Sequence, residues 1–319
     1  MKRFEVLDGW RGISILLVLI GHWLPLGLKK WGMNDAIAAT GMVIFFILSG
    51  FLITNLLIRD QNIINFLIRR FMRIIPLAWL VLFITLFLKN ANVHQWTSNM
   101  LFYANWPPMG LIDETAHFWS LCLEIQFYIL MALLVFLLKD KSFWLLPFLC
   151  LGITLYRIYN GAEIAINTYF RLDEILAGCM LALIYYKGSQ NIKKHIGNFN
   201  TIVLLVLLIC SSHHQFSWLN YLRPYIALCL VGSTLFSNRE KWYDSLLKSR
   251  FLFFVASISY ALYVIHGALN GTWLGQGDTL EKYLKRPLLF LVTFILAYIS
   301  TNYYEKHWIK LGKKLAQKT

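Results

Sequence analysis

Apolar residues recur along the chain in long runs, and short polar or charged segments separate each run from the next. A run of about 17 to 25 mostly apolar residues can cross the ~30 Å hydrocarbon core of a membrane as a helix. Ten runs are present, near residues 10–28, 36–58, 74–88, 118–138, 142–157, 171–186, 197–212, 219–236, 252–272 and 287–304. The pattern predicts an all-α integral membrane protein, with residues 1–319 forming a single bundle of about ten transmembrane helices and no separate soluble domain.

The composition indicates a lipid bilayer, and not nucleic acid, as the partner of this basic chain. Of its 319 residues, 58% are hydrophobic and only 14% are charged, whereas soluble proteins average about 25% charged residues. The formal net charge is +14, but the basic residues are distributed over the connecting segments and form no single patch. If the N-terminus is cytoplasmic, the inner segments carry 20 Lys and Arg and the outer segments carry 8. Because basic residues concentrate on the cytoplasmic side, both termini are expected there.

Two ionisable residues, Arg11 and His22, interrupt the first apolar run. Such groups are costly at membrane depth, at least ~2.5 kcal/mol on insertion scales, so they usually face a bundle interior or a water-filled cavity and have a function. The two residues are eleven positions apart, which is about 20° past three helical turns and about 16 Å along the axis. We therefore expect both side chains on one functional face of the first helix.

Seven segments of the chain, in order, resemble the membrane acyltransferase-3 family, which includes the O-antigen and exopolysaccharide O-acetyltransferases. They are LDGWRGISILLVLIGH at Leu7 to His22, FFILSGFLIT at Phe45 to Thr54, FLIRRFMRIIPL at Phe66 to Leu77, FWSLCLEIQFYIL at Phe118 to Leu130, RLDEILAG at Arg171 to Gly178, SYALYVIH at Ser259 to His266, and YEKHW at Tyr304 to Trp308. The resemblance runs from one end of the chain to the other.

The resemblance implies a multi-pass enzyme of the bacterial inner membrane. Family members take an acyl group, most often acetyl from cytoplasmic acetyl-CoA, and place it on a hydroxyl of a carbohydrate or lipid-linked glycan, such as the O-antigen of lipopolysaccharide. The partners expected from this likeness are an acyl-CoA, a glycan acceptor and the bilayer, and a homo-oligomer is left open. No metal is implied, since the five cysteines are scattered singly without CxxC pairing.

Three residues are candidates for the chemistry: His22, Glu124 and Asp173. An imidazole titrates near neutral pH, so His22 suits a general base toward the acceptor hydroxyl, or a covalent acyl relay. Glu124 is expected to orient His22 as the carboxylate of a Ser-His-Asp triad does. The structural alternatives are a histidine hydrogen-bonded inside the bundle, a Glu124 paired with an arginine such as Arg171, and an Arg171–Asp173 ion pair at a helix start.

Three arginines, Arg11, Arg70 and Arg73, are expected at the cytoplasmic side. Under the resemblance their planar guanidinium groups hold the phosphates of CoA, and the ~16 Å to His22 is comparable to an extended phosphopantetheine arm. The alternatives are that Arg70 and Arg73 only set the topology of the chain, and that Arg11 extends to the inner interface beside Asp8.

The substrate side is expected toward the outer leaflet. If the predicted helices end as the apolar runs do, His22, Glu124 and His266 each lie about 9 Å below the outer edge. Gly50, after Ser49, is expected to permit close helix packing. The candidate substrate-binding residues are Trp119, Ser120, Arg171, Tyr260, Tyr263 and His266.

Two positions depart from the family pattern. Many members carry an aspartate where this chain has Val43, and the commoner VEEQFY string reads LEIQFY here, so Ile125 replaces a second carboxylate. The extracytoplasmic hydrolase-like domain of some members is not expected here. Two other function classes remain open, a polytopic transporter and a non-catalytic envelope-assembly protein, although no paired repeats of the kind found in transporters are visible.

Overall fold

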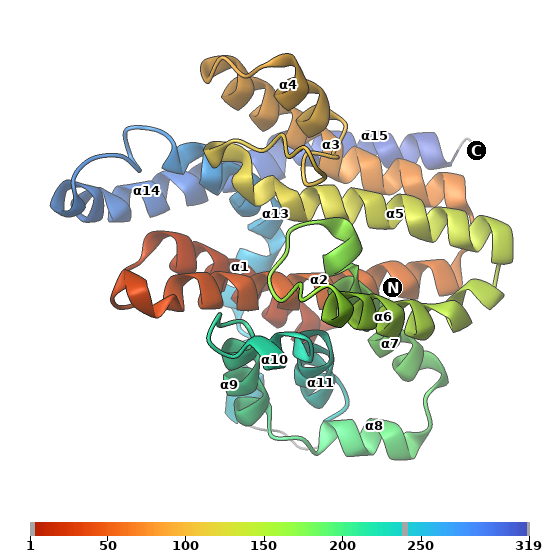
Figure 1. Ribbon diagram of the computed structural model, residues 1–319. Coiled ribbons are helices and arrows are strands. Elements are labelled where there is room, and N and C mark those ends of the chain that lie inside the picture. The colour runs from red at the N-terminus through yellow and green to blue at the C-terminus, as the bar shows by residue number, and fades with distance from the viewer. Residues whose placement is uncertain (1–3, 238–241, 318–319) are drawn as a thin grey trace. The chain divides into compact units, whose positions relative to one another are not determined.

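The computed structural model describes residues 4–237 and 242–317, and all regular structure in these ranges is helical (Figure 1). The elements are α1 (Glu5–Trp23), η1 (Lys29–Trp31), α2 (Met33–Arg59), α3 (Ile63–Leu88), α4 (Val93–Met100), η2 (Asp113–Phe118), α5 (Trp119–Leu138), α6 (Lys141–Tyr159), α7 (Thr168–Lys187), α8 (Gln190–Gly197), α9 (Thr201–Ser211), α10 (Ser217–Asn220), α11 (Arg223–Leu235), α12 (Trp242–Leu247), α13 (Arg250–Asn270), α14 (Thr279–Ile299), η3 (Ser300–Glu305) and α15 (Lys306–Ala316). Five cations used in the topology expectation, Lys2, Arg3, Arg239, Lys241 and Lys318, lie outside the described residues.

Within the described ranges, seven helical segments are long and apolar enough to cross a membrane. They are α1, α2, α3, η2 with α5, α6, α13, and α14 with η3 and α15. A pair bent by 78°, α8 with α9, raises the number to eight if it forms one broken span. The described part of the chain is therefore all-helical, with seven or eight candidate membrane spans.

The first helix is shorter than its apolar run. α1 ends at Trp23, and Leu24 already has an extended backbone with φ −101° and ψ 147°. The cause is Pro25, because a proline disfavours the helical conformation of the residue before it. The expected extension to Leu28 is thus wrong, and His22 lies in the last turn of α1 and not about 9 Å inside it.

The third helix, in contrast, begins earlier than its apolar run. The side chain of Asn62 accepts a hydrogen bond from the backbone N–H of Asn65 at 3.0 Å and caps the first turn of α3. Arg70 and Arg73, expected just before this helix, therefore lie inside it and share one side of it, since residues three apart are neighbours on a helix surface.

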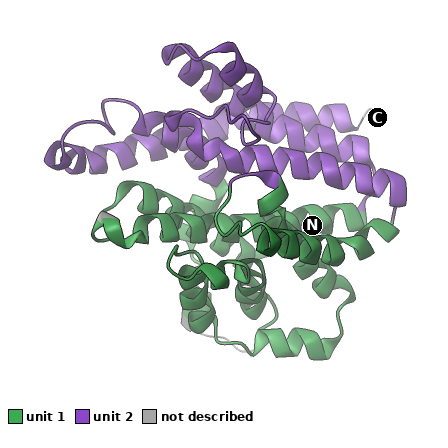
Figure 2. Ribbon diagram, viewed as in Figure 1, with its two compact units in different colours: residues 1–59, 140–165, 169–257 green, residues 60–139, 166–168, 258–319 purple. Residues whose placement is uncertain are grey.

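The chain forms two compact units, which Figure 2 shows in different colours. Unit 1 comprises residues 1–59, 140–165 and 169–257, and unit 2 comprises residues 60–139, 166–168 and 258–319. In unit 1, α2 and α7 pack closely through two glycines. A Cβ on Gly50 would collide with the Ile175 carbonyl, and one on Gly178 would collide with the Ile47 carbonyl. The predicted role of Gly50 in close helix packing is confirmed.

In unit 2, the connection between α3 and α5 is ordered by its own polar groups. Asn92 and Gln95 form a capping box at the start of α4. Lys89 pairs with Glu114 at 2.6 Å, and the Asn105 amide donates to the Thr168 hydroxyl at 2.9 Å. These bonds fix the segment that leads into η2 and α5, where several of the predicted site residues lie.

Candidate functional site

One uninterrupted helix, α1, carries both Arg11 and His22. Eleven residues of regular helix separate them by about 16 Å along the axis and place them on one face. The Arg11 side chain is half-buried and the His22 side chain is exposed. Both groups make further interactions within the protein.

The turn that holds His22 is fastened to the start of α2. The Asn34 amide donates to the backbone carbonyls of Gly21 and Leu24, each at 2.7 Å, and so satisfies carbonyls at the open end of α1. A Cβ on Gly21 would lie 2.7 Å from the Asn34 carbonyl oxygen, so the two helices touch at this level. The next residue, Asp35, interacts electrostatically with the His22 ring. The sequence did not point to Asp35. It lies on α2, the same helix as Val43, the position at which many family members carry an aspartate.

In unit 2, Glu124 is buried, with 5% of its surface exposed, and it accepts a hydrogen bond from the Tyr128 hydroxyl one turn later on α5. The Arg70 guanidinium interacts electrostatically with both groups and with Arg73. The predicted residues Arg70, Arg73 and Glu124 are therefore grouped between α3 and α5. The alternative that Glu124 pairs with an arginine such as Arg171 stays a prediction.

A second carboxylate, Glu305, lies near this group at the end of the π-helix η3. It is buried and accepts hydrogen bonds from the hydroxyls of Thr301 at 2.8 Å and Ser300 at 3.4 Å. It also interacts electrostatically with Arg73 and with Tyr260. The Tyr260 hydroxyl itself donates to the Ile74 carbonyl of α3. π-helical turns are rare and are frequent at functional sites, so Glu305 joins the candidate residues.

Three predicted substrate-binding residues meet at the junction of η2, α5 and α13. The hydroxyls of Ser120 and Tyr263 are 2.6 Å apart, and Tyr263 also donates to the His117 carbonyl. The His266 ring contacts the Tyr263 carbonyl at 2.6 Å and lies 4.6 Å, centroid to centroid, from the His117 ring. Trp119, at the start of α5, is half-buried. His117 completes this imidazole and hydroxyl cluster and was not predicted.

In unit 1, the alternative of an Arg171–Asp173 ion pair is wrong. Asp173 pairs with Arg157 at 2.6 Å. Glu174 pairs with Arg171 at 2.9 Å and also with Arg223 at 2.7 Å. The reason is helical geometry: residues two apart point to opposite sides of a helix, whereas residues three apart are neighbours.

This ionic cluster is almost fully buried, with exposed fractions from 0% to 3%. Three guanidinium groups face two carboxylates, so the cluster carries a net charge of one cation. Thr154 donates to Asp173 at 3.2 Å and is 3.0 Å from the Tyr225 hydroxyl. Arg157, the last residue of the apolar run 142–157, is a core residue of α6.

Several residues of these clusters escaped the sequence analysis: Asp35, His117, Tyr128, Arg157, Glu174, Arg223 and Glu305. Some had a usable signal, since Glu305 lies inside the YEKHW string and Arg157 is a charge within an apolar run. Among residues 4–237 and 242–317, no group of His, Cys, Asp and Glu side chains is arranged to hold a metal ion.

The chain is similar in sequence to a known protein family and to several known proteins. The sequence profile of an acyltransferase domain, that of the acyltransferase-3 family, matches residues 4–303. A protein named "Putative O-acetyltransferase SACOL0978" from Staphylococcus aureus (strain COL) is 28% identical over 318 residues, covering 84% of this chain and 51% of that protein. The O-acetyltransferase OatA of Staphylococcus aureus (strain NCTC 8325 / PS 47) is 24% identical over 362 residues, covering 97% of this chain and 57% of the relative.

The chain thus spans about half the length of the curated relatives it matches. No solved structure matches it. Because the family profile covers nearly the whole chain and spans six of the seven segments noted in the sequence, the predicted resemblance is confirmed: this chain belongs to the acyltransferase-3 family.

Proposed function

We propose that this protein is a membrane O-acetyltransferase that moves acetyl from cytoplasmic acetyl-CoA to a hydroxyl of a cell-envelope carbohydrate or lipid-linked glycan. The names of its relatives support O-acetyl transfer. The observation that carries the proposal is the single helix α1, which holds a guanidinium and an imidazole on one face about 16 Å apart. That spacing suits a long donor with an anionic end and a reactive thioester end.

In the proposed reaction, His22 takes the proton of the acceptor hydroxyl while the hydroxyl oxygen attacks the carbonyl carbon of the thioester. The tetrahedral intermediate then collapses, the C–S bond breaks, and the CoA sulfur receives the proton from the imidazolium. A two-step route through an acyl-imidazole on His22 gives the same products.

The carboxylates are proposed to orient and stabilise this histidine. Asp35 is the partner that we favour, because Asn34 fastens its turn of α2 to the turn of α1 that holds His22. A carboxylate beside an imidazole fixes its tautomer and stabilises its protonated form. Glu124 stays a proposal as a further catalytic residue, and it accepts a hydrogen bond from Tyr128. Asp173 pairs with Arg157, and for Asp173 we favour a structural role over the predicted catalytic one.

For the donor, we propose that Arg11, Arg70 and Arg73 hold the CoA phosphates. For the acceptor, the cluster of Ser120, Tyr263 and His266 offers hydroxyl and imidazole groups that suit a saccharide. The remaining candidates for acceptor binding are Trp119, Arg171 and Tyr260.

The proposed topology has ten spans in one membrane domain, with both termini in the cytoplasm of a bacterial cell. α7 has 20 residues, enough to span about 30 Å, and its charges at Arg171, Asp173 and Glu174 lie in ion pairs. α10 and α11 together cover residues 217–235. The proposal of ten spans counts these two beside the seven candidate spans and the bent pair of α8 and α9.

The test is release of CoA thiol from acetyl-CoA by the purified protein in liposomes with saccharide acceptors. His22→Asn is expected to reduce turnover at least ~100-fold, the usual contribution of a general base, while the protein stays folded. His195→Asn, an exposed histidine on α8, is the matched control. Normal turnover by His22→Asn would refute the assigned role.

The same assay separates donor binding from chemistry. Arg73→Ala is expected to raise the KM for acetyl-CoA with little change in kcat, because the phosphates are bound in both ground and transition states. An unchanged KM would contradict phosphate binding at Arg73. Solute uptake without thiol release would indicate a transporter, and neither activity would indicate an assembly protein.

A further inference from the structure

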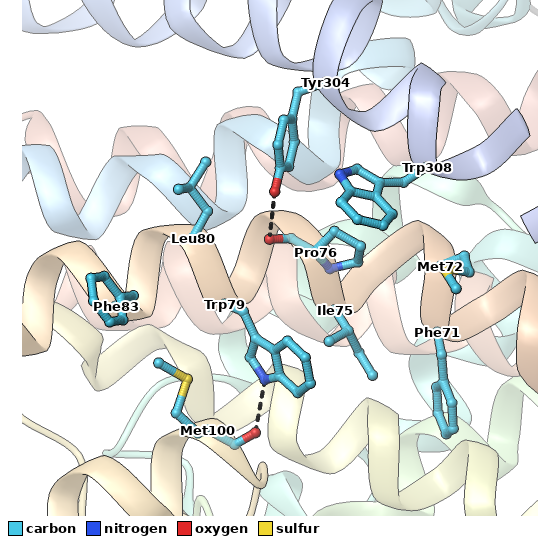
Figure 3. A pocket seen from close by; sticks show the side chains of 10 residues that line it. All are labelled: Phe71, Met72, Ile75, Pro76, Trp79, Leu80, Phe83, Met100, Tyr304 and Trp308. Atoms are coloured by element: carbon cyan, nitrogen blue, oxygen red, sulfur yellow. Dashed lines mark hydrogen bonds between the residues drawn. The ribbon is translucent and has the colours of Figure 1, made fainter. Parts of the chain in front are cut away.

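A groove of about 580 Å³ lies in unit 2 along one side of α3, and Figure 3 shows its lining. Helix α3 supplies most of the walls, while η3, α15 and the end of α4 supply the rest. The lining residues are Phe71, Met72, Ile75, Pro76, Trp79, Leu80, Phe83, Met100, Tyr304 and Trp308.

The groove presents hydrocarbon and aromatic surface and little else. The Trp79 indole donates to the Met100 carbonyl at 2.9 Å, and the Tyr304 hydroxyl donates to the Pro76 carbonyl at 3.3 Å, as the dashed lines in Figure 3 show. These two polar groups are therefore engaged inside the protein. The third, the Trp308 indole, is of a type that commonly bonds lipid headgroups at a membrane interface. An apolar chain is the ligand class that fits.

The length of the groove matches one leaflet of a membrane. Phe71 and Phe83 mark its ends on α3, and twelve residues of helix extend about 18 Å. Half of the ~30 Å hydrocarbon core is about 15 Å. One acyl chain of one lipid therefore fits along it.

The end of the groove near Met72 is basic. Arg69 is exposed and lies one turn before Met72 on the same side of α3. Gly312 of α15 packs against this turn, since a Cβ on it would lie 2.7 Å from Met72 and 3.7 Å from the Ile68 carbonyl. Lys310 and Lys313 flank Gly312 on α15. Positive charge thus collects where the headgroup of a lipid in the groove would lie.

We propose that this groove binds an anionic phospholipid, with one acyl chain along α3 and the headgroup phosphate at Arg69. The lining of the groove holds no histidine, cysteine or acidic side chain that could catalyse acyl transfer. The bound lipid is therefore a structural ligand and not the acyl donor. The inference does not depend on the transfer reaction proposed above.

The test is lipid retention by the detergent-purified full chain, measured by native mass spectrometry with equal amounts of dioleoylphosphatidylglycerol and dioleoylphosphatidylcholine. The unaltered protein is expected to prefer the anionic lipid by about fivefold, the effect of one basic residue near a charged headgroup. Arg69→Ala is expected to remove the preference. Arg250→Ala, an exposed arginine at the start of α13, is the control and keeps it.

A second variant tests the chain. Leu80→Asn places an amide in the groove at a residue that is 42% exposed, so the core is spared, and it is expected to lower retention of both lipids. Leu133→Asn, on α5 and 52% exposed, is the matched control outside the lining. Unchanged preference in Arg69→Ala, unchanged retention in Leu80→Asn, or an isoprenoid lipid retained in place of phospholipid would overturn the proposal.

Discussion

Replacing Asp173 by Asn tests whether the buried ionic cluster of unit 1 is structural. The carboxylate is fully buried, pairs with Arg157 at 2.6 Å and accepts from Thr154 at 3.2 Å. The amide keeps the shape of the side chain but removes its charge, so the net charge of the cluster rises by one inside the protein.

The cost follows from the geometry. Two charges about 4 Å apart attract by ~4 kcal/mol at an effective dielectric constant of 20, and breaking a buried pair by removing one partner costs about 3–5 kcal/mol. Arg157 keeps its hydrogen bonds to the Glu163 and Ala162 carbonyls, at 3.0 and 3.3 Å. We therefore expect a loss of about 3 kcal/mol in the free energy of unfolding, the lower end of that range.

A double variant, Arg157→Met with Asp173→Asn, removes both charges and restores the net charge of the cluster. It lacks the two carbonyl bonds of Arg157, worth about 1 kcal/mol each. The expected loss is then about 2 kcal/mol, less than that of the single change at Asp173. Such recovery is characteristic of a buried ion pair.

The assay is unfolding in mixed micelles by added SDS, followed by tryptophan fluorescence, with Asp113→Asn as an exposed carboxylate control. Turnover of the folded fraction is measured alongside and is expected to be near normal for Asp173→Asn. A stable Asp173→Asn protein without turnover would refute the structural reading and favour the predicted catalytic role. A double variant less stable than either single variant would refute the charge argument.

Three further changes address the other contacts. Gly50→Ala is expected to lower the free energy of unfolding in detergent by about 1–3 kcal/mol, because its methyl group meets the Ile175 carbonyl. Gly152→Ala, on α6 with open space around it, is the control and is expected to cause no loss. Glu305→Gln is expected to raise the KM for acetyl-CoA about threefold or more through Arg73, and normal kinetics would remove it from the site. Asp35→Asn is expected to lower kcat at least ~10-fold in the thiol-release assay, and Asp35→Glu to recover part of it; equal rates for both variants would contradict orientation of His22.

Hydropathy located most of the helices because burial in a membrane demands long apolar runs whatever the tertiary fold. It misplaced ends where local chemistry decides them. Pro25 ends α1 before its apolar run is complete, and Asn62 starts α3 before its run begins. Both signals are present in the sequence, but hydropathy by itself does not detect a helix cap or a proline.

The sequence predicted individual residues of the candidate site better than it predicted the contacts between them. Motif strings identified Arg70, Glu124 and Tyr263, which the structure places within clusters. The partners of these residues were missed, since Glu305 is far from Arg73 in the sequence and His117 is far from His266. A string records which residue types occur at a spacing and carries no information on what faces them.

The sequence by itself determined that this is a helical membrane protein of the acyltransferase-3 family, because hydrophobic length and motif order are properties of a linear chain. The tertiary structure alone decided which charges pair. Arg157 and Asp173 meet only because α6 packs beside α7, and the helical twist turns Arg171 toward Glu174. In a medium of low polarity each buried charge must find a partner in space, and that choice depends on packing, which the order of residues along the chain does not specify.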